Sequence, residues 1–308
     1  MIITVTMNPA IDKTVDIDRM ERGGLNRIQH VELDAGGKGI NVSKTIKSLG
    51  GDSLATGFLG GKAGGTIEGV LKEWEIPTDF VHVAGETRTN LKIVEKLGEV
   101  TELNEPGPEV TPEQVEKLLE KLENYANEET LFVLAGSIPK GVDKNIYKVI
   151  TERVHAKGAK VLMDADGELF VQALKAHPDM IKPNRVELEA YYQMDYVASE
   201  EELEQMGKKL LAEGSELAAI SMGKQGAMFL TKDRTIRCPG LSVKAHSTVG
   251  AGDAMVAALA YSWDAKSSLE DTIRLGMATS AGAVTTIGTK PPTREVVDEL
   301  VKQVEIIG

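Results

Sequence analysis

Cysteine is nearly absent from this chain of 308 residues. The single thiol, Cys238, has no second cysteine to pair with, so an intrachain disulfide framework is excluded. Cys238 stands in a short strand-like run, where we expect an ordinary packing role. The first ten residues read as a strand and lack the basic and then apolar plan of a signal peptide. We therefore expect a reducing, cytoplasmic environment.

Long apolar runs and an excess of basic charge are missing too. No stretch is long and apolar enough to span a bilayer. The formal net charge is −12, which argues against nucleic-acid binding because that function needs a basic face. An acidic protein that binds phosphate groups must concentrate its lysines and arginines locally, so the positions of these residues are informative.

What the sequence does contain is an alternation of strands and helices. Strands are predicted at 2–6, 53–59, 130–135, 160–164 and 217–221. Helices are predicted at 41–49, 64–75, 111–124 and 143–156, in a short segment ending at 176, and over most of the chain after 249. Near-continuous apolar strands separated by helices indicate an α/β fold with a parallel sheet covered on both faces. Sites in such sheets lie at the carboxyl ends of the strands.

Two segments, at about 12–34 and 88–104, break this alternation. Apolar and polar residues take turns in them, which is typical of β-hairpins, and we expect these strands to lie outside the main sheet. The chain shows no internal repeat, low-complexity tract or linker. We therefore expect residues 1–308 to form one domain, to which the two segments add a small β-sheet.

A glycine-rich run that ends in Asp253 precedes a helix-like stretch. The glycines allow the backbone N–H groups of Gly250, Ala251 and Gly252 to turn inward as an anion-binding nest at a helix N-terminus. A carboxylate beside such a nest is suited to accept a proton from a hydroxyl that attacks a phosphate. The alternative is a simple turn in which Asp253 caps the helix.

A second glycine-rich run spans Asp34 to Ser43 and also leads into a helix pattern. Three glycines within four residues, Gly37 among them, remove side chains from one surface, so a polyhydroxylated ligand can lie against the backbone. Lys38 and Asn41 supply a charge and an amide nearby. The run does not match a Walker A loop, and the alternative is a tight turn before a helix.

Asn184 and Glu187 are spaced i, i+3, which places both on one face of a helix. An amide and a carboxylate in this arrangement can hold Mg²⁺ through water, because Mg²⁺ keeps part of its hydration shell. The same spacing is the signature of a helix-capping box. The two roles are compatible.

Cations gather in the two hairpin segments. Arg27 lies in the first, and Arg88 and Lys92 lie four residues apart in the second, so on a strand they share a face. Arginine is suited to bidentate recognition of phosphate. Each of these residues is alternatively a solvated surface charge. Their convergence in an acidic protein favours an acceptor that already carries a phosphate group.

These motifs, with the runs at 6–12 and 182–187, resemble the PfkB, or ribokinase-like, family of carbohydrate kinases, in order and spacing along essentially the whole chain. The resemblance implies a three-layer α/β/α fold with a mostly parallel sheet and a small β lid. It further implies ATP and Mg²⁺ as cofactors, Asp253 as the catalytic base, and a glycine run that stabilises the transferred phosphoryl group. The lid strands also suggest a homodimer.

The resemblance assigns binding roles to further residues. The sugar-phosphate site is expected to comprise Asp12, Arg27, Gly37, Lys38, Asn41, Arg88, Asn90 and Ser137. The nucleotide site is expected to comprise Lys182, Asn184, Ser221, Gly223, Gly226 and Ser280. Asn184 and Glu187 are expected to hold Mg²⁺ through water. Two positions depart from many relatives, which have Asp or Asn in place of Ser247 and Asn in place of Ser280.

The acceptor implied by the resemblance is a ketohexose phosphate. Fructose 1-phosphate is expected, giving fructose 1,6-bisphosphate, with tagatose 6-phosphate or fructose 6-phosphate as alternatives. A nucleoside or vitamin acceptor would need an apolar or aromatic pocket, but aromatic residues make up only 4% of the chain. A non-catalytic sugar or nucleotide sensor is a further alternative, against which the presence of Asp253, Gly250 and Gly252 argues.

Overall fold

A nine-stranded sheet lies at the centre of the computed structural model, which describes all of residues 1–308. Its strands are β1 (Ile2–Thr6), β4 (Leu54–Leu59), β5 (Val81–His82), β8 (Leu131–Ala135), β9 (Lys160–Asp164), β10 (Met180–Ile181), β11 (Leu217–Ser221), β12 (Ala227–Leu230) and β13 (Thr235–Cys238). They lie in the order β13-β12-β11-β10-β9-β8-β1-β4-β5. Neighbours from β11 to β5 are parallel, and β12 and β13 extend one edge antiparallel. The mostly parallel sheet predicted from the sequence is confirmed.

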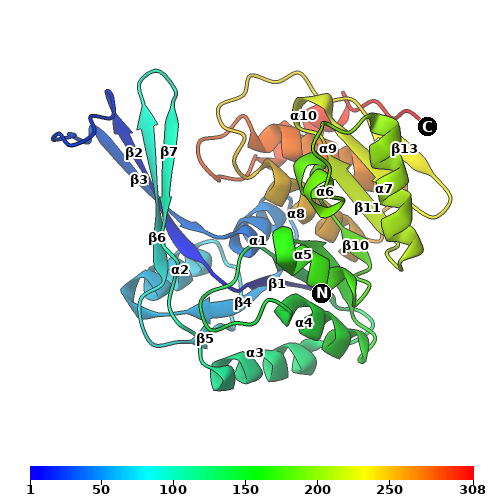
Figure 1. Ribbon diagram of the computed structural model, residues 1–308, viewed down its shortest axis with the longest axis horizontal. Coiled ribbons are helices and arrows are strands. Elements are labelled where there is room, and N and C mark those ends of the chain that lie inside the picture. The colour runs from blue at the N-terminus through cyan, green and yellow to red at the C-terminus, as the bar shows by residue number, and fades with distance from the viewer.

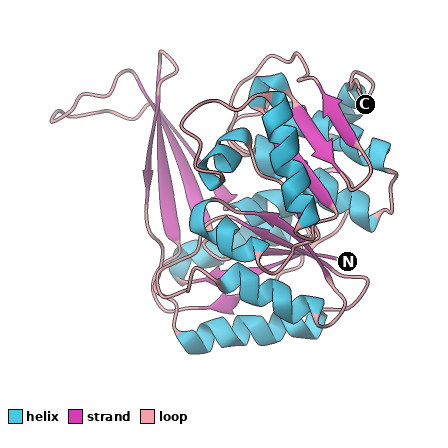
Figure 2. Cartoon of the chain, turned by 45° about the vertical axis from the view of Figure 1, so that its right-hand side comes forward, coloured by secondary structure: helices cyan, strands magenta, loops and turns pink.

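Helices cover the main sheet on both faces (Figures 1 and 2). They are α1 (Lys38–Ser48), α2 (Gly61–Glu73), α3 (Pro112–Tyr125), α4 (Ile146–His155), α5 (Gly167–Leu174), α6 (Arg185–Tyr191), α7 (Glu200–Ala212), α8 (Ala251–Asp264), α9 (Leu269–Ala283) and α10 (Arg294–Val301). Helices α3 to α7 share one half of the core, and α1, α8, α9 and α10 share the other. The result is the three-layer α/β/α architecture that the sequence led us to expect.

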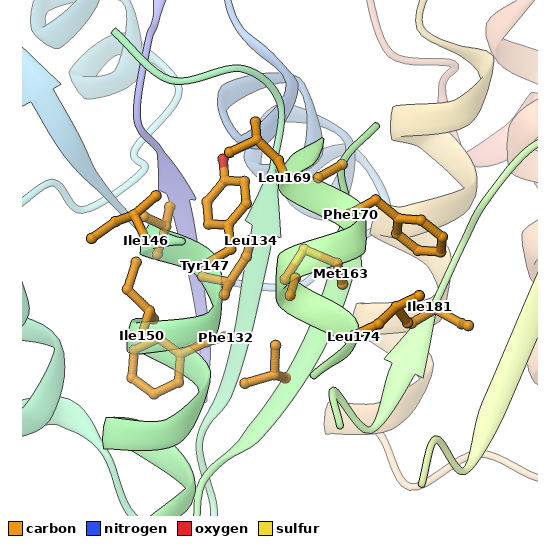
Figure 3. Packing of buried hydrophobic residues seen from close by; sticks show 14 of the residues in the cluster. Phe132, Leu134, Ile146, Tyr147, Ile150, Met163, Leu169, Phe170, Leu174 and Ile181 are labelled. Carbon is orange, nitrogen blue, oxygen red and sulfur yellow. The ribbon is translucent and has the colours of Figure 1, made fainter. Parts of the chain in front are cut away.

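Side chains of each central strand alternate between the two halves of the core. In β8, Phe132 and Leu134 belong to the half covered by α3 to α7, whereas Leu131 and Val133 belong to the other half. Figure 3 shows Phe132 and Leu134 beside buried side chains of α4 and α5, including Tyr147. All residues of β8 are buried because helices cover both faces, which explains its continuous apolar sequence.

A second, four-stranded sheet projects from the main body, at the upper left of Figure 1. Its strands are β2 (Ala10–Ile17), β3 (His30–Gly36), β6 (Arg88–Glu95) and β7 (Val100–Asn104), in the order β3-β2-β6-β7. Strands β2 and β6 are parallel, and each forms an antiparallel pair with its outer neighbour. The strands expected outside the main sheet are therefore present, and we call them the small sheet.

The chain passes directly from the centre of the main sheet into the small sheet, because β1 ends at Thr6 and β2 begins at Ala10. The last residues of β1, β8 and β9 are register neighbours: Thr6 pairs with Ala135, and Ala135 pairs with Asp164. This carboxyl edge is where an α/β sheet places its ligands. None of the helices is both long and apolar enough to cross a membrane.

Candidate active site

The glycine run before α8 forms a helix N-terminus with unpaired donors. Gly250 is the N-cap and has a φ of 84°, in the left-handed region that favours glycine. The first backbone N–H groups of α8, from Ala251 and Gly252 onward, have no partner within the helix. Nζ of Lys182 lies 3.4 Å from the position that a Cβ atom would take on Gly252. Free N–H groups beside a lysine provide an environment for an anion.

Asp253 does not cap α8. It is the third residue of the helix, it is only 8% exposed, and no side chain caps the helix at Gly250. Its Oδ2 accepts a hydrogen bond of 2.8 Å from Nδ2 of Asn41 on α1. The capping alternative for this aspartate is therefore not what the structure shows.

Burial raises the pKa of Asp253 to about 6. The negative charge of Asp164 acts in the same direction. The hydrogen bond from Asn41 and the positive charges of Lys38 and Lys182 oppose both effects. A buried carboxylate with this pKa is a typical proton acceptor at neutral pH.

Asp164 joins two lysines at the carboxyl end of β9. Its Oδ1 lies 3.4 Å from Nζ of Lys38 and 3.3 Å from Nζ of Lys182. Burial alone would raise the pKa of Asp164, but the two lysines lower it below its usual value. Its Oδ2 is buried without a hydrogen-bond partner. Asp164 was not predicted as a site residue, although its place at the end of a predicted parallel strand is a signal in the sequence.

The residues of the small sheet that were predicted to bind the sugar phosphate include two that lie together. Asp12 and Asn90 are register partners, and Nδ2 of Asn90 donates to Oδ1 of Asp12 at 3.0 Å. Nζ of Lys92 lies 3.6 Å from Oδ2 of Asp12. A Cβ atom on Gly36 would lie 2.5 Å from the same carboxylate, so only glycine leaves room for it. Gly37 follows with a φ of 106°, which also requires glycine.

Arg88 lies at the same end of the small sheet but binds the backbone. Its Nε and Nη2 donate to the carbonyl oxygen of Asn8 at 3.2 and 3.0 Å, and its Nη1 donates to that of Glu105 at 3.3 Å. Burial lowers the pKa of Arg88, while the charge of Asp12 works against this. A guanidinium group has more N–H groups than these contacts use, so donors remain for an anion.

Arg27 is not brought to this site. It is exposed on the loop between β2 and β3, beyond the pair formed by Asp16 and His30, whereas Asp12 lies toward the other end of β2. Arg27 is far from Asp12 because the hairpin runs away from it: the four residues of β2 from Asp12 to Asp16 alone span about 13 Å. Ser137 is exposed on the loop after β8, next to Gly136, whose Cβ would lie 3.4 Å from Lys38.

Two of the residues predicted to bind the nucleotide meet along the same edge. Asn184 forms an isolated bridge with Ser221, at the end of β11. Gly223 has a φ of 59° in the turn that leads into β12, and a Cβ on Gly226 would lie 1.9 Å from the carbonyl oxygen of Cys238. Because β12 runs antiparallel to β11, this turn joins the two strands of a hairpin. Ser280 lies half-buried on α9 and makes no hydrogen bond to the others.

The chain is similar to known carbohydrate kinases along nearly its whole length. The sequence model described as pfkB family carbohydrate kinase matches residues 5–295. The chain is 35% identical to the 1-phosphofructokinase of Bacillus subtilis and 33% identical to the D-tagatose-1-phosphate kinase of Bacillus licheniformis, over 99% of both chains in each case. This protein belongs to the pfkB family of carbohydrate kinases. As a family member it is an ATP-dependent sugar kinase, which confirms the family predicted from its motifs.

A solved structure of the family gives the same result for the fold. Phosphofructokinase-2 from Escherichia coli, in complex with fructose-6-phosphate, superposes on this kinase with a TM-score of 0.91. The two are 25% identical, and the match covers 98% of both chains. The Escherichia coli enzyme has also been solved in a tetrameric inhibited form, with a TM-score of 0.91 and 26% identity over 98% of both chains.

The residues predicted to hold Mg²⁺ form a capping box in this kinase. Oδ1 of Asn184 accepts from the N–H of Glu187 at 2.9 Å, and Oε2 of Glu187 accepts from the N–H of Asn184 at 2.8 Å. Burial raises the pKa of Glu187. No three His, Cys, Asp or Glu side chains gather as a ligand cage. The second carboxylate oxygen of Glu187 and the unpartnered Oδ2 of Asp164 fit a hydrated ion rather than a caged one.

Proposed function

We propose that this kinase transfers the γ-phosphoryl group of ATP to the 6-hydroxyl of fructose 1-phosphate. The observation that carries the proposal is the buried Asp253 carboxylate, which stands beside the N-terminus of α8 and is held by Asn41. The hydroxyl oxygen attacks the γ-phosphorus, the bond to the leaving oxygen of ADP breaks, and the hydroxyl proton passes to Asp253. The products are fructose 1,6-bisphosphate and ADP.

The environment of Asp253 supports its role as the base. A pKa of about 6 keeps the carboxylate mostly ionised at neutral pH while making it more basic than an exposed aspartate. The hydrogen bond from Asn41 uses one carboxylate oxygen, Oδ2, and fixes the orientation of the group. The other oxygen is available to receive the proton of the acceptor.

The N–H groups at Gly250, Ala251 and Gly252 would bind the transferred phosphoryl group. Helix N-terminal donors stabilise negative charge that develops there, and they are already in place before the reaction. Lys182 beside Gly252 and Lys38 on the other side of Asp164 add positive charge. This local concentration of cations compensates for the acidity of the chain as a whole.

Oxygens without partners support a sugar acceptor. Oδ1 of Asn41 and Oδ1 of Asn90 are buried and accept no hydrogen bond. Buried acceptors of this kind are costly unless a ligand or water donates to them, and a ketohexose offers several hydroxyl donors. Asp12 next to Asn90 and the bare backbone at Gly37 would complete the sugar floor.

The phosphate already present on the acceptor would lie against Lys38 and Arg88. Burial alone would lower the pKa of Lys38, but nearby carboxylates, Asp164 above all, raise it above its usual value. Lys38 therefore stays charged. Arg88 keeps N–H donors that its carbonyl contacts do not use. Ser137, on the loop beside Lys38, can add a hydroxyl to the same group.

A tagatose phosphate is the second candidate acceptor. The chain is 33% identical to a relative named D-tagatose-1-phosphate kinase, close to its identity with 1-phosphofructokinases. Tagatose 6-phosphate and fructose 6-phosphate are the other ketohexose phosphates that the same residues could accommodate, and fructose-6-phosphate is named as a ligand of the Escherichia coli neighbour.

The nucleotide would lie along Asn184, Ser221 and Gly223, with Lys182 toward its phosphates. We propose that Gly226 shapes this turn and that Ser280 lines the adenine side. Mg²⁺ bound with ATP would neutralise charge on the phosphate groups. Glu187 and Asn184 would hold its hydration shell, and the fixed capping box would keep the Glu187 carboxylate in one orientation.

The proposal is tested by measuring ADP release with Mg-ATP and a panel of acceptors. The panel is fructose 1-phosphate, tagatose 1-phosphate, tagatose 6-phosphate, fructose 6-phosphate and unphosphorylated fructose. We expect the highest kcat/KM with fructose 1-phosphate. A preference for a tagatose phosphate would change the substrate and keep the mechanism, whereas turnover restricted to unphosphorylated fructose would refute the phosphate-binding role of Lys38 and Arg88.

We also propose that two copies associate through the outer face of the small sheet. Val31, Leu33 and Leu103 on this face are 45%, 63% and 53% exposed, and they flank buried Val15 and Ile93. An exposed apolar sheet face of this kind is typical of an interface. We expect light scattering to give a dimer or larger assembly for the wild type and a monomer for Leu33→Glu. A wild-type monomer would exclude this interface.

A further inference from the structure

The loop between α9 and α10, residues 284–293, lies against the polar face of the small sheet. A narrow cleft between them is lined by Asp12, Thr14, Glu32, Asp34 and Lys92 from the sheet and by residues 287–290 from the loop. Register pairs Asp12 with Asp34 and Thr14 with Glu32, so the two acidic residues of β3 share the face that carries the sugar-side aspartate. This contact brings strands from the first third of the chain and a loop near residue 290 together at the candidate site.

Two side-chain contacts tie the loop to β3. Oγ1 of Thr289 donates to Oδ2 of Asp34 at 2.9 Å, and Lys290 forms an ion pair with Glu32. Thr289 and Asp34 are both partly shielded, whereas Lys290 is exposed. Lys290 is exposed and ion pairs of exposed side chains contribute little, so we expect the Thr289–Asp34 hydrogen bond to be the stronger of these two contacts.

Asp34 also has a partner on helix α1. Nζ of Lys44 on α1, which is only 1% exposed, lies 2.9 Å from Oδ2 of Asp34 and donates to the carbonyl oxygen of Ala35 at 2.7 Å. A buried ammonium group needs such partners, because leaving it unpaired would cost several kcal/mol. Helix α1 also carries Lys38 and Asn41. The catalytic scheme above gives Lys44 no task, and anchoring Asp34 supplies one.

The same loop supports the anion-binding glycines. A Cβ atom on Gly250 would lie 3.7 Å from Cα of Thr289, so the loop backbone packs directly behind this glycine. At the start of the loop, the carbonyl oxygen of Val284 accepts from the N–H groups of His246 and Ser247 at 2.6 and 3.2 Å. The loop thus contacts Gly250 through Thr289, and it contacts the residues just before the glycine run through Val284.

We propose that Asp34 and Thr289 are positioning residues that hold the anion-binding N-terminus of α8 in register with the sugar-binding small sheet. The chain of contacts runs from Lys44 through Asp34 to Thr289 and on to Gly250. It fixes the distance between the acceptor hydroxyl and the transferred phosphoryl group without touching either. The inference rests on the proposed phosphoryl transfer at Asp253, and it predicts an effect on kcat rather than on acceptor affinity.

The test compares Thr289→Val with Thr289→Ser. Valine keeps the shape and loses the hydroxyl, so we expect kcat to fall roughly tenfold to hundredfold, the loss expected from a small misplacement of reacting groups. Serine keeps the hydroxyl, so it should retain most of kcat. The KM for the acceptor and the melting temperature should change little in both variants. Glu32→Gln, which removes the ion pair with the exposed Lys290 but leaves the Thr289–Asp34 hydrogen bond in place, serves as the matched control and should keep wild-type kcat.

Three results would overturn the inference: wild-type kcat in Thr289→Val, an equal loss in the valine and serine variants, or a raised acceptor KM with unchanged kcat. Should Thr289→Val melt below the assay temperature, Asp34→Asn measured with and without Lys44→Met provides the second comparison. In that case an unchanged kcat in the double variant would contradict the positioning role. Wild-type turnover in the same assay separates failure of this inference from failure of the proposed function.

Discussion

Two buried aspartates at opposite edges of the main sheet have opposite surroundings. Asp179, at the amino edge just before β10, is 9% exposed and has many partners. Nζ of Lys160 donates to it at 2.7 Å, the N–H of Val161 donates at 2.8 Å, and Nε2 of His155 lies 2.8 Å from its Oδ2. Asp253, at the carboxyl edge, is 8% exposed and has one such partner.

This difference in partners separates a fully paired carboxylate from the one that we propose as the catalytic base. Burial on its own would raise the pKa of Asp179, but the contacts with His155 and Lys160 lower it below its usual range. Burial and the charge of Asp164 instead raise the pKa of Asp253 to about 6. A carboxylate whose oxygens are all satisfied can only hold the fold, whereas one with an open oxygen keeps its affinity for a proton.

The largest expected effect follows from Asp253→Asn. An amide cannot accept the proton of the acceptor hydroxyl, so kcat should fall about 10²- to 10⁴-fold. The fold should be at least as stable at pH 8, because the variant no longer buries a charge beside Asp164. Steady-state kinetics and urea denaturation provide the two measurements.

Asp264→Asn is the matched control for this variant. Asp264 ends the same helix but is exposed and paired with the chain N-terminus, so its substitution should leave kcat unchanged. An Asp253→Asn variant that keeps most of its kcat would remove the base from the mechanism and with it the functional half of the comparison.

The opposite result is expected for Asp179→Asn. Its kcat should match the wild type, while the free energy of unfolding should fall by about 3 kcal/mol because charged hydrogen bonds to Lys160 and His155 are lost. A lowered carboxyl pKa stabilises the fold above the unfolded pKa and ceases to do so as the pH falls through the folded value. The difference in the free energy of unfolding between the wild type and the variant should therefore shrink in acid. Equal stability of the variant and the wild type at pH 7 would show that Asp179 is not a structural anchor.

Local patterns in the sequence predicted those parts of the site whose geometry is set by a few consecutive residues. The glycines before Asp253 need a left-handed turn at Gly250, and that turn starts α8 as expected. Asn184 and Glu187 form the capping box that their spacing indicates. Thr111 and Pro112 begin α3 in the same way. In each case the physical cause lies within one turn of helix.

Contacts between distant segments could not be read from such patterns. Asp164 acquires its role only when β9 places it between Lys38 and Lys182. Arg27 and Arg88 looked alike in the sequence, but the direction of the hairpin takes Arg27 away from Asp12. Strands β5 and β10, too short for a periodicity signal, were not predicted, nor was α7.

The smallest expected effect concerns the hydrogen bond from Asn41 to Asp253. Because kcat/KM reports the ionisation of free enzyme, its acid limb should have a midpoint near pH 6, with activity lost as Asp253 becomes protonated below it. Asn41 lowers the pKa of Asp253, so Asn41→Ala should move this midpoint to higher pH.

Ser48→Ala is the matched control for this shift, since Ser48 ends the same helix and bonds to the carbonyl oxygen of Pro292. Its pH profile should follow the wild type. An acid limb that stays in place in Asn41→Ala, or one that moves equally in both variants, would mean that another group sets the profile. Such a result would also mean that hydrogen-bond partners do not explain the different pKa values of Asp253 and Asp179, because the bond from Asn41 would have no measurable influence on Asp253.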